Sequence, residues 1–157
     1  MIRVGHGFDV HSFSDEEGRV LRLAGVEFPG HRGLAGHSDA DVIAHAVADA
    51  LLGAAGRGDI GEMFPDTDPA WAGADSLELL DAVVAIVMAA GWSVANVDVT
   101  VVAETPKLAP QREAMQERLA AIVGAPVSVK GKRAEGLGAL GRGEGIAAWA
   151  VTLLEQP

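Results

Sequence analysis

Two side chains near the start of the chain, Asp9 and His11, have the types and spacing of metal ligands. They lie in a stretch where Val4, Phe8 and Val10 occupy even positions, the period of a half-buried strand. Residues two apart on a strand point to the same side, so Asp9 and His11 project together. A carboxylate and an imidazole held in this way supply two of the three protein ligands of a catalytic zinc site. An Asp-x-His pair is also common among surface residues, so the hypothesis depends on a third ligand.

The candidate third ligand is His45, on a predicted helix that is capped by Ser38, with Asp41 in the reciprocal position of a capping box. Asp41, His45 and Asp49 lie four residues apart, on the face opposite the stripe that we expect to be buried. That stripe contains Val42, Ile43, Ala46, Val47, Ala50 and Leu51. All 5 histidines lie within the first 45 residues, and this clustering favours a shared site over a lone surface histidine.

Two glycine-rich stretches are candidates for binding sugar or phosphate groups. Residues 56–61 match G-x-G-x-x-G, but a helix precedes them and a proline-containing loop follows, so the context excludes a dinucleotide fingerprint. Asp59 in this stretch is either a ligand of two adjacent ribose hydroxyls or a solvated loop carboxylate.

Residues 131–145 combine six glycines with Lys132, Arg133 and Arg142, which suits a loop that wraps phosphates. A flexible surface hairpin is the alternative, since the G-K-[ST] ending of a Walker loop is missing.

The remaining patterns predict an α+β fold in a single domain, residues 1–157, with a sheet packed on helices. Short strands are expected at 21–23 and 26–28, and further strands at 97–103, 127–129 and 146–154. Helices are expected at 76–90, capped by Asp75, and from Pro110 to Gly124.

The composition disfavours several classes of function. With 22 acidic residues against 12 basic ones, the formal net charge is -10, which disfavours a duplex nucleic-acid binder. The chain has no cysteine, so disulfides and thiolate zinc sites are excluded. It shows no signal-like segment and no apolar run long enough to span a bilayer. We therefore expect a soluble cytoplasmic protein without membrane or nucleic-acid partners.

Several long motifs follow one another along the whole chain: Gly5–His11, Gly36–Val42, His45 with Asp49–Leu52, Gly58–Gly61, Phe64–Pro69, Asn96–Val99, Pro106-Lys107 and Gly141–Gly145. Together they make the chain similar to the 2-C-methyl-D-erythritol 2,4-cyclodiphosphate synthase family of the non-mevalonate isoprenoid pathway. Members of that family convert 4-diphosphocytidyl-2-C-methyl-D-erythritol 2-phosphate to the cyclic diphosphate and release CMP, a cyclising phosphorus-oxygen lyase reaction.

The resemblance implies two metal sites and a homotrimer whose active sites lie at subunit interfaces. Asp9, His11 and His45 match the ligands of Zn²⁺ or another divalent transition metal, and Glu135 matches the ligand of a second ion, Mg²⁺ or Mn²⁺. His37 and Ser38 match a pair that contacts the substrate phosphate, with His37 in a catalytic role. The other matching substrate contacts are Asp59, Ile60 and Gly61 for the sugars, Phe64, Pro65, Asp66, Thr67 and Asp68 for methylerythritol, and Ala103, Pro106 and Lys107 for cytidine.

One segment departs from the family pattern. Gly131-Lys132-Arg133-Ala134-Glu135 stands where Ala-Thr-Thr-Thr-Glu is usual. Arg133 takes the position of a threonine that stabilises the transition state, so we expect a catalytic role for it, with Lys132 as a substrate contact. Ala139 replaces the usual phenylalanine near the trimer axis, where Arg142 is kept, and this weakens the case for an isoprenyl diphosphate in that axial pocket.

Two other functions remain open. A metal-dependent phosphodiesterase acting on nucleoside diphosphates would use the same ligands to activate water, and its product would be that of simple hydrolysis. A non-catalytic trimer that binds isoprenyl diphosphates would have no need of a complete metal set. The cyclase is the leading hypothesis.

Overall fold

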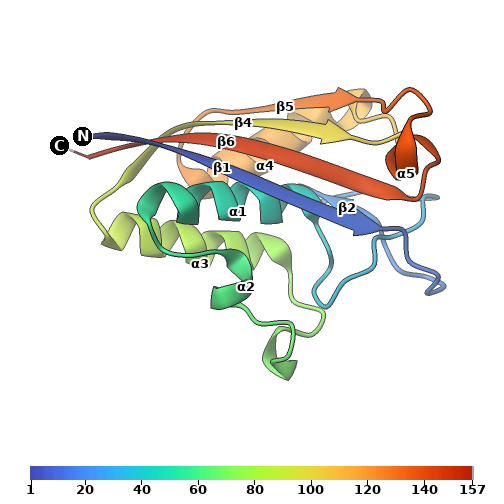
Figure 1. Cartoon of the computed structure of the whole chain (residues 1–157), viewed down its shortest axis with the longest axis horizontal. Coiled ribbons are helices and arrows are strands. Elements are labelled where there is room, and N and C mark those ends of the chain that lie inside the picture. The colour runs from blue at the N-terminus through green and yellow to red at the C-terminus, as the bar shows by residue number, and fades with distance from the viewer. Residues whose placement is uncertain (157) are drawn as a thin grey trace.

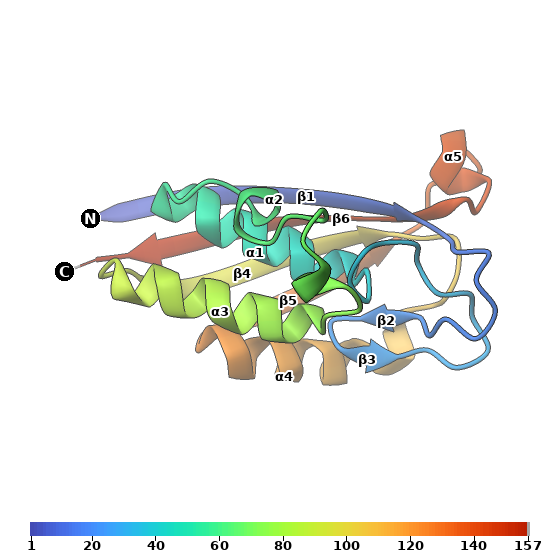
Figure 2. The same ribbon diagram turned by 90° about the horizontal axis from the view of Figure 1, so that it is seen from below.

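The longer predicted strands assemble into one mixed sheet, with all the longer helices on the same side of it (Figures 1 and 2). The computed structural model describes residues 1–156. Within them the sheet has the order β1-β6-β4-β5, in which only β4 and β5 are parallel. Its strands are β1 (Ile2–Ser12), β4 (Ser93–Val102), β5 (Val127–Lys132) and β6 (Gly145–Glu155). The hairpin strands β2 (Arg22–Leu23) and β3 (Val26–Glu27) pair separately.

The helices of the described residues are α1 (Val42–Ala55), α2 (Ile60–Met63), α3 (Ser76–Ala89), α4 (Arg112–Val123) and α5 (Gly138–Gly141). Short 3-10 turns cover Pro69–Trp71 and Ala109–Gln111. Helix α1 lies between β1 and α3, and Figure 2 shows α4 next to α3 along the same face. The α+β class and the predicted strand and helix positions are confirmed to within a few residues. None of the helices in residues 1–156 has the length and apolar character needed to cross a membrane.

Strand β1 alternates as predicted, but the side facing its own helix layer is the odd-numbered one. A Cβ on Gly5 would lie 1.9 Å from the carbonyl oxygen of Ala50, and one on Gly7 would lie 1.9 Å from that of Ala46. Only glycine permits this approach, so α1 lies directly on the strand backbone. The same packing brings Asp9 and His11, on the same face, up to α1.

The even-numbered side of β1 is left exposed, contrary to the expectation that it is buried. Its apolar side chains, together with one from β6, are between 43% and 66% exposed: Ile2, Val4, Phe8, Val10 and Val151. The Phe8 ring packs against Trp149 with centroids 5.0 Å apart. An uncovered apolar sheet face of this kind is typical of an interface with another chain.

The N-terminus of α1 differs from the prediction, because its cap is Asp41 rather than Ser38. Ala40 has a φ of 58°, in the left-handed region, so a helix cannot run through it from Ser38. The Asp41 carboxylate accepts from four backbone N–H groups, those of Ala24, Gly25, Ile43 and Ala44. It is fully buried and therefore does not share a solvent-facing side with His45 and Asp49. The expected apolar stripe of α1 is confirmed as buried.

Candidate active site

Strand β1 and helix α1 bring the three predicted metal ligands together. Asp9 Oδ2 lies 2.9 Å from His11 Nε2 and 3.0 Å from His45 Nδ1, and the two ring nitrogens are 3.4 Å apart. Each of the three residues therefore offers one potential ligand atom, and these three atoms lie within 4.8 Å of one another. Three potential ligand atoms that converge in this way need a proton or a cation between them, because their lone pairs would otherwise repel one another. Two imidazoles and a carboxylate with an open side fit a divalent transition metal.

Each imidazole is oriented by a second hydrogen bond on its other nitrogen. His11 Nδ1 donates to the backbone oxygen of Ala35 at 2.6 Å, which leaves Nε2 to face Asp9. His45 Nε2 donates to Ser76 Oγ at 2.8 Å, and Ser76 in turn donates to the Asp39 carboxylate. Such outer partners fix the tautomer of a ligating histidine and are typical of metal sites.

The charges of the cluster depend on one another. Burial by itself raises the pKa of Asp9, but hydrogen bonds from His11 and His45 outweigh it and hold the pKa well below its usual range. Burial lowers the pKa of His11, but the hydrogen bond to Asp9 and the charge of Asp9 outweigh it, so that the pKa is raised. Without a metal, a proton on His11 therefore supplies the positive charge that Asp9 requires.

A pocket of about 420 Å³ opens beside this cluster. It is lined by His11, Gly36, His37, Ser38, His45, Ile60, Gly61, Phe64, Pro65, Asp66, Trp71 and Leu79. We call it the metal pocket. His37 Nε2 donates to the backbone oxygen of Asp68 at 2.9 Å, which anchors this exposed ring at the pocket wall. Asp49 accepts from the Ile60 N–H at 2.8 Å, and this bond ties α2 to α1 at the opposite wall.

A second pocket, of about 440 Å³, lies beside the ends of β4 and β5. It is lined by Ala103, Glu104, Pro106, Lys107, Leu108, Ala109, Arg112, Gly131, Lys132 and Arg133. We call it the cationic pocket, because four of these residues are basic. Arg133 is held by Glu104, which accepts from its Nε at 3.1 Å and its Nη2 at 2.8 Å. Glu104 also accepts from the Ala134 N–H at 2.8 Å, so one carboxylate orients both the side chain and the loop.

The two pockets share no lining residue within residues 1–156. The predicted site residues are therefore divided between two places in one chain. Asp59 is used as the cap of α2, accepting from the Glu62 N–H, and Asp68 caps the turn at 69–71. Thr67 does not line the metal pocket.

The predicted residues of the 131–145 segment are only partly brought into these pockets. Glu135 lies outside the Asp9, His11 and His45 cluster and has a φ of 53°. Ala139 and Arg142 lie in or next to α5, away from both sets of lining residues, and Arg142 pairs with Glu144 at 2.5 Å. The segment contains the short helix α5 and is not a plain hairpin.

Several residues of the site escaped the sequence analysis. Asp39 and Ser76 are joined to His45 only by the tertiary fold, and Glu104, within the stretch 103–109 that matches the cytidine pocket, is joined to Arg133 in the same way. Asp39 stands beside Ser38, and a carboxylate next to a predicted phosphate contact was the one local signal that could have drawn attention to it. Trp71 and Leu79 complete the metal pocket and resemble ordinary core residues in the sequence.

Comparison with known proteins gives a consistent result. The YgbB family pattern matches residues 2–155. The chain is 58% identical to the 2-C-methyl-D-erythritol 2,4-cyclodiphosphate synthase of Rubrobacter xylanophilus over 98% of this chain and 95% of that protein. It superposes on a structure of the bifunctional IspDF from Campylobacter jejuni with a TM-score of 0.94 at 43% identity, covering 100% of this chain and 43% of that longer chain. A Plasmodium falciparum IspF in complex with CDP gives a TM-score of 0.85 at 31% identity, covering 99% and 96% of the two chains. The family pattern spans nearly every described residue, and the chain belongs to the YgbB family.

Proposed function

We propose that this protein is a 2-C-methyl-D-erythritol 2,4-cyclodiphosphate synthase. It would convert 4-diphosphocytidyl-2-C-methyl-D-erythritol 2-phosphate to the cyclic diphosphate, with the 2-phosphate attacking the β-phosphorus and CMP leaving. The observation that carries the proposal is the ready-made ligand cluster of Asp9, His11 and His45 at the wall of the metal pocket, in a chain of this family. A phosphate nucleophile is already ionised at neutral pH, so the site has to hold two anions together and neutralise charge rather than supply a strong base.

The residues of the metal pocket divide this work. Asp9, His11 and His45 would hold Zn²⁺ or another divalent transition metal, which supplies a positive charge for a phosphate oxygen. His37 and Ser38 stand in the same wall and would contact the attacking phosphate. Residues 60–66 form the opposite wall and would enclose the methylerythritol, since this part of the lining combines apolar side chains with backbone groups.

The cationic pocket would take the cytidine diphosphate part. Lys107, Lys132 and Arg133 give it a positive lining in a chain of net charge -10. Arg133 can reach a phosphate oxygen with the donors that Glu104 leaves free, because a guanidinium carries five N–H groups. Glu135, which follows on the same loop, is the proposed ligand of a second ion, Mg²⁺ or Mn²⁺. Arg142 and Ala139 remain proposed contacts at the trimer axis.

Two observations support a homotrimer with shared sites. The metal pocket and the cationic pocket share no lining residue within one chain, and a neighbouring subunit would supply the second pocket of a site that one substrate spans. The exposed apolar face of β1 and β6 offers a surface for such contacts. A cytoplasmic location is part of the same proposal.

The test is phosphorus NMR of the purified protein with the cytidyl substrate, Zn²⁺ and Mg²⁺. We expect a cyclic diphosphate signal and one CMP per product molecule. His45→Ala should lower the rate by about 10³-fold or more, because it removes a metal ligand. Glu117→Gln, on the exposed side of α4, is the matched control and should leave the rate unchanged.

Other outcomes would contradict the proposal. Simple hydrolysis products would favour the phosphodiesterase. Unchanged substrate in the presence of bound metal would favour the non-catalytic binding protein.

A further inference from the structure

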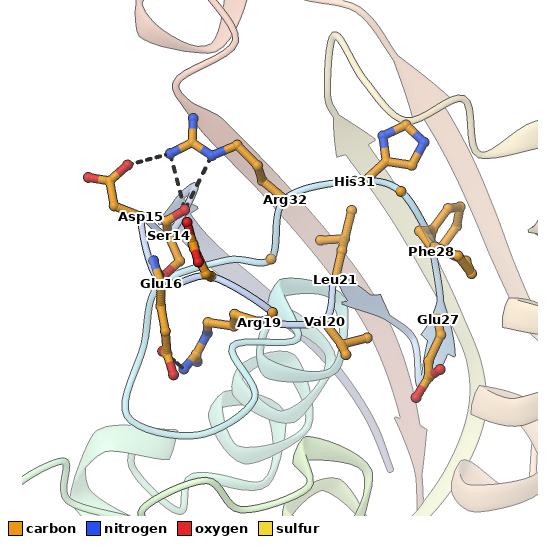
Figure 3. A pocket seen from close by; sticks show the side chains of 15 residues that line it. Ser14, Asp15, Glu16, Arg19, Val20, Leu21, Glu27, Phe28, His31 and Arg32 are labelled. Atoms are coloured by element: carbon orange, nitrogen blue, oxygen red, sulfur yellow. Dashed lines mark hydrogen bonds and ion pairs between the residues drawn. The ribbon is translucent and has the colours of Figure 1, made fainter.

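Arg19 belongs to none of the motifs above, yet its guanidinium reaches the segment that carries His37 and Ser38. It donates to three backbone oxygens: Nε to that of Leu34 at 2.5 Å, and Nη2 to those of Gly36 at 3.0 Å and Ser38 at 2.6 Å. Figure 3 shows Arg19 beside Glu16 on the wall of a pocket of about 590 Å³ formed by residues 14–21 and 27–33. The Arg19 side chain is 20% exposed, whereas Glu16, 3.4 Å away, is 68% exposed and contributes little.

The segment held by Arg19, residues 34–38, forms no helix or extended strand. Its start is attached to the end of β1 by the Ala35 N–H, which donates to the Ser12 oxygen at 2.8 Å. The oxygen of Ala35, between two of the oxygens bound by Arg19, is the one that accepts from His11 Nδ1. At Gly36 an added Cβ would lie 3.1 Å from His11 Cε1, so this glycine leaves little room for a side chain beside the ring of a proposed metal ligand. A displacement of this segment would therefore move His11, His37 and Ser38 together.

Three carbonyl oxygens that converge on one point repel one another unless a strong donor lies between them. A guanidinium suits this position, because it is planar, stays charged, and presents its donors in a fixed fork. An ammonium group carries the same charge but cannot span all three oxygens with the same geometry. The contacts of Arg19 thus depend on its shape as well as its charge.

We propose that Arg19 is a positioning residue, which holds segment 34–38 so that Ala35 orients His11 and so that His37 and Ser38 face the metal pocket. The part concerning His37 and Ser38 rests on the proposed cyclase function. The part concerning His11 requires only the metal site.

The experiment compares Arg19→Lys with Arg32→Lys. Arg32 lines the same pocket and also donates to a backbone oxygen, that of Ser14 at 3.2 and 3.1 Å, and it pairs with Asp15 (Figure 3). Its side chain makes no hydrogen bond or ion pair with segment 34–38, so it controls for the loss of an arginine from this loop.

Three readouts are measured on folded, purified protein. The affinity for Zn²⁺ alone, by calorimetry, should fall about tenfold in Arg19→Lys, as is usual for partners of metal ligands, and should not change in Arg32→Lys. The ¹⁵N spectrum of His11 in the zinc-loaded protein should show a loss of the fixed Nδ1–H form in Arg19→Lys alone. With the cytidyl substrate, kcat should fall about 10-fold to 100-fold while KM changes less than about threefold, because ground-state binding is largely retained.

An unchanged zinc affinity and an unchanged His11 spectrum in Arg19→Lys would overturn the proposal. A wild-type protein that forms no cyclic product would overturn the cyclase function, and the first two readouts would still decide the role of Arg19. If Arg19→Lys does not fold, the wild-type protein is examined for scalar coupling through the hydrogen bond from Arg19 Nε to the Leu34 carbonyl. Detection of that coupling supports the proposal and its absence overturns it.

Discussion

The metal pocket and the cationic pocket are built in contrasting ways. The metal ligands lie on a long strand and a buried helix, they are half-buried, and each imidazole has a second partner in the same chain. The cationic pocket depends on exposed side chains of a glycine-rich loop, where Arg133 is 67% exposed and is oriented by a single carboxylate. The three proposed metal ligands all come from one chain, whereas the cationic pocket presents exposed charge that a ligand or a neighbouring subunit would desolvate. A rigid half and an adaptable half are suited to a substrate that must be held at one end and reoriented at the other.

The largest expected effect tests whether the two halves act across subunits. His45→Ala removes one proposed ligand from the metal pocket, which is the metal half of the site. The double variant Lys132→Glu, Arg133→Glu reverses the charge at two exposed positions of the cationic pocket, which is the cationic half. Each should be inactive alone. In mixed trimers one interface in three pairs two intact halves, so refolding an equal mixture should restore about a quarter of wild-type activity. No recovery, in mixed trimers verified by native mass spectrometry, would mean that both halves act within one chain.

The next effect concerns the second partners that make the metal half rigid. Ser76→Ala removes the acceptor of His45 Nε2 and the link to Asp39. We expect the affinity for Zn²⁺ to fall about tenfold, measured by calorimetry. Ser93→Ala is the matched control, because its hydroxyl donates to the Glu155 oxygen at the far end of the sheet. Equal affinities of the two variants would show that Ser76 has no part in metal binding.

A smaller effect follows from pH. The pKa of His11 is raised in the metal-free site, so zinc must displace a proton at a pH below that value. Zinc affinity should therefore fall as the pH is lowered, by up to about tenfold per unit, with a proton released on binding. The stability of the metal-free protein has the opposite dependence. The pairing of His11 with Asp9 contributes fully below pH 6.5, and its contribution is lost as the pH rises through the raised pKa. Calorimetry in buffers of different ionisation enthalpy measures the proton that is released when zinc binds. If no proton is released, His11 is not protonated in the metal-free site.

The smallest effect is expected in the exposed half. Glu104→Gln keeps an acceptor for the Ala134 N–H but weakens the hold on Arg133. The melting temperature should stay nearly unchanged, and the affinity for CDP should change by less than about fivefold, because the Arg133 side of this ion pair is 67% exposed and solvent screens it. A large loss of stability, measured by thermal unfolding, would mean that the exposed half is as rigid as the metal half.

The local patterns predicted much of this protein. The strand that ends at residue 12, the helices 76–89 and 112–123 and the buried stripe of α1 were expected to within a few residues, since their periodicity and caps are local properties. The cluster of Asp9, His11 and His45 was also expected, because their types and strand or helix positions already place them on definite faces. The capping box from Ser38 was wrong, because the left-handed Ala40 and the distant N–H groups of Ala24 and Gly25 favour Asp41.

By itself, the sequence determined the element order, the metal-ligand types and the family motifs, because these depend on residue identity and short spacing. Only the tertiary structure decided which side of β1 is buried, since close approach of α1 to Gly5 and Gly7 reverses the side that the apolar residues suggest. It also brought Arg19, Asp39, Ser76 and Glu104 to the site from separate segments. Their contacts with residues up to 38 positions away depend on how the chain packs, and no local period records them.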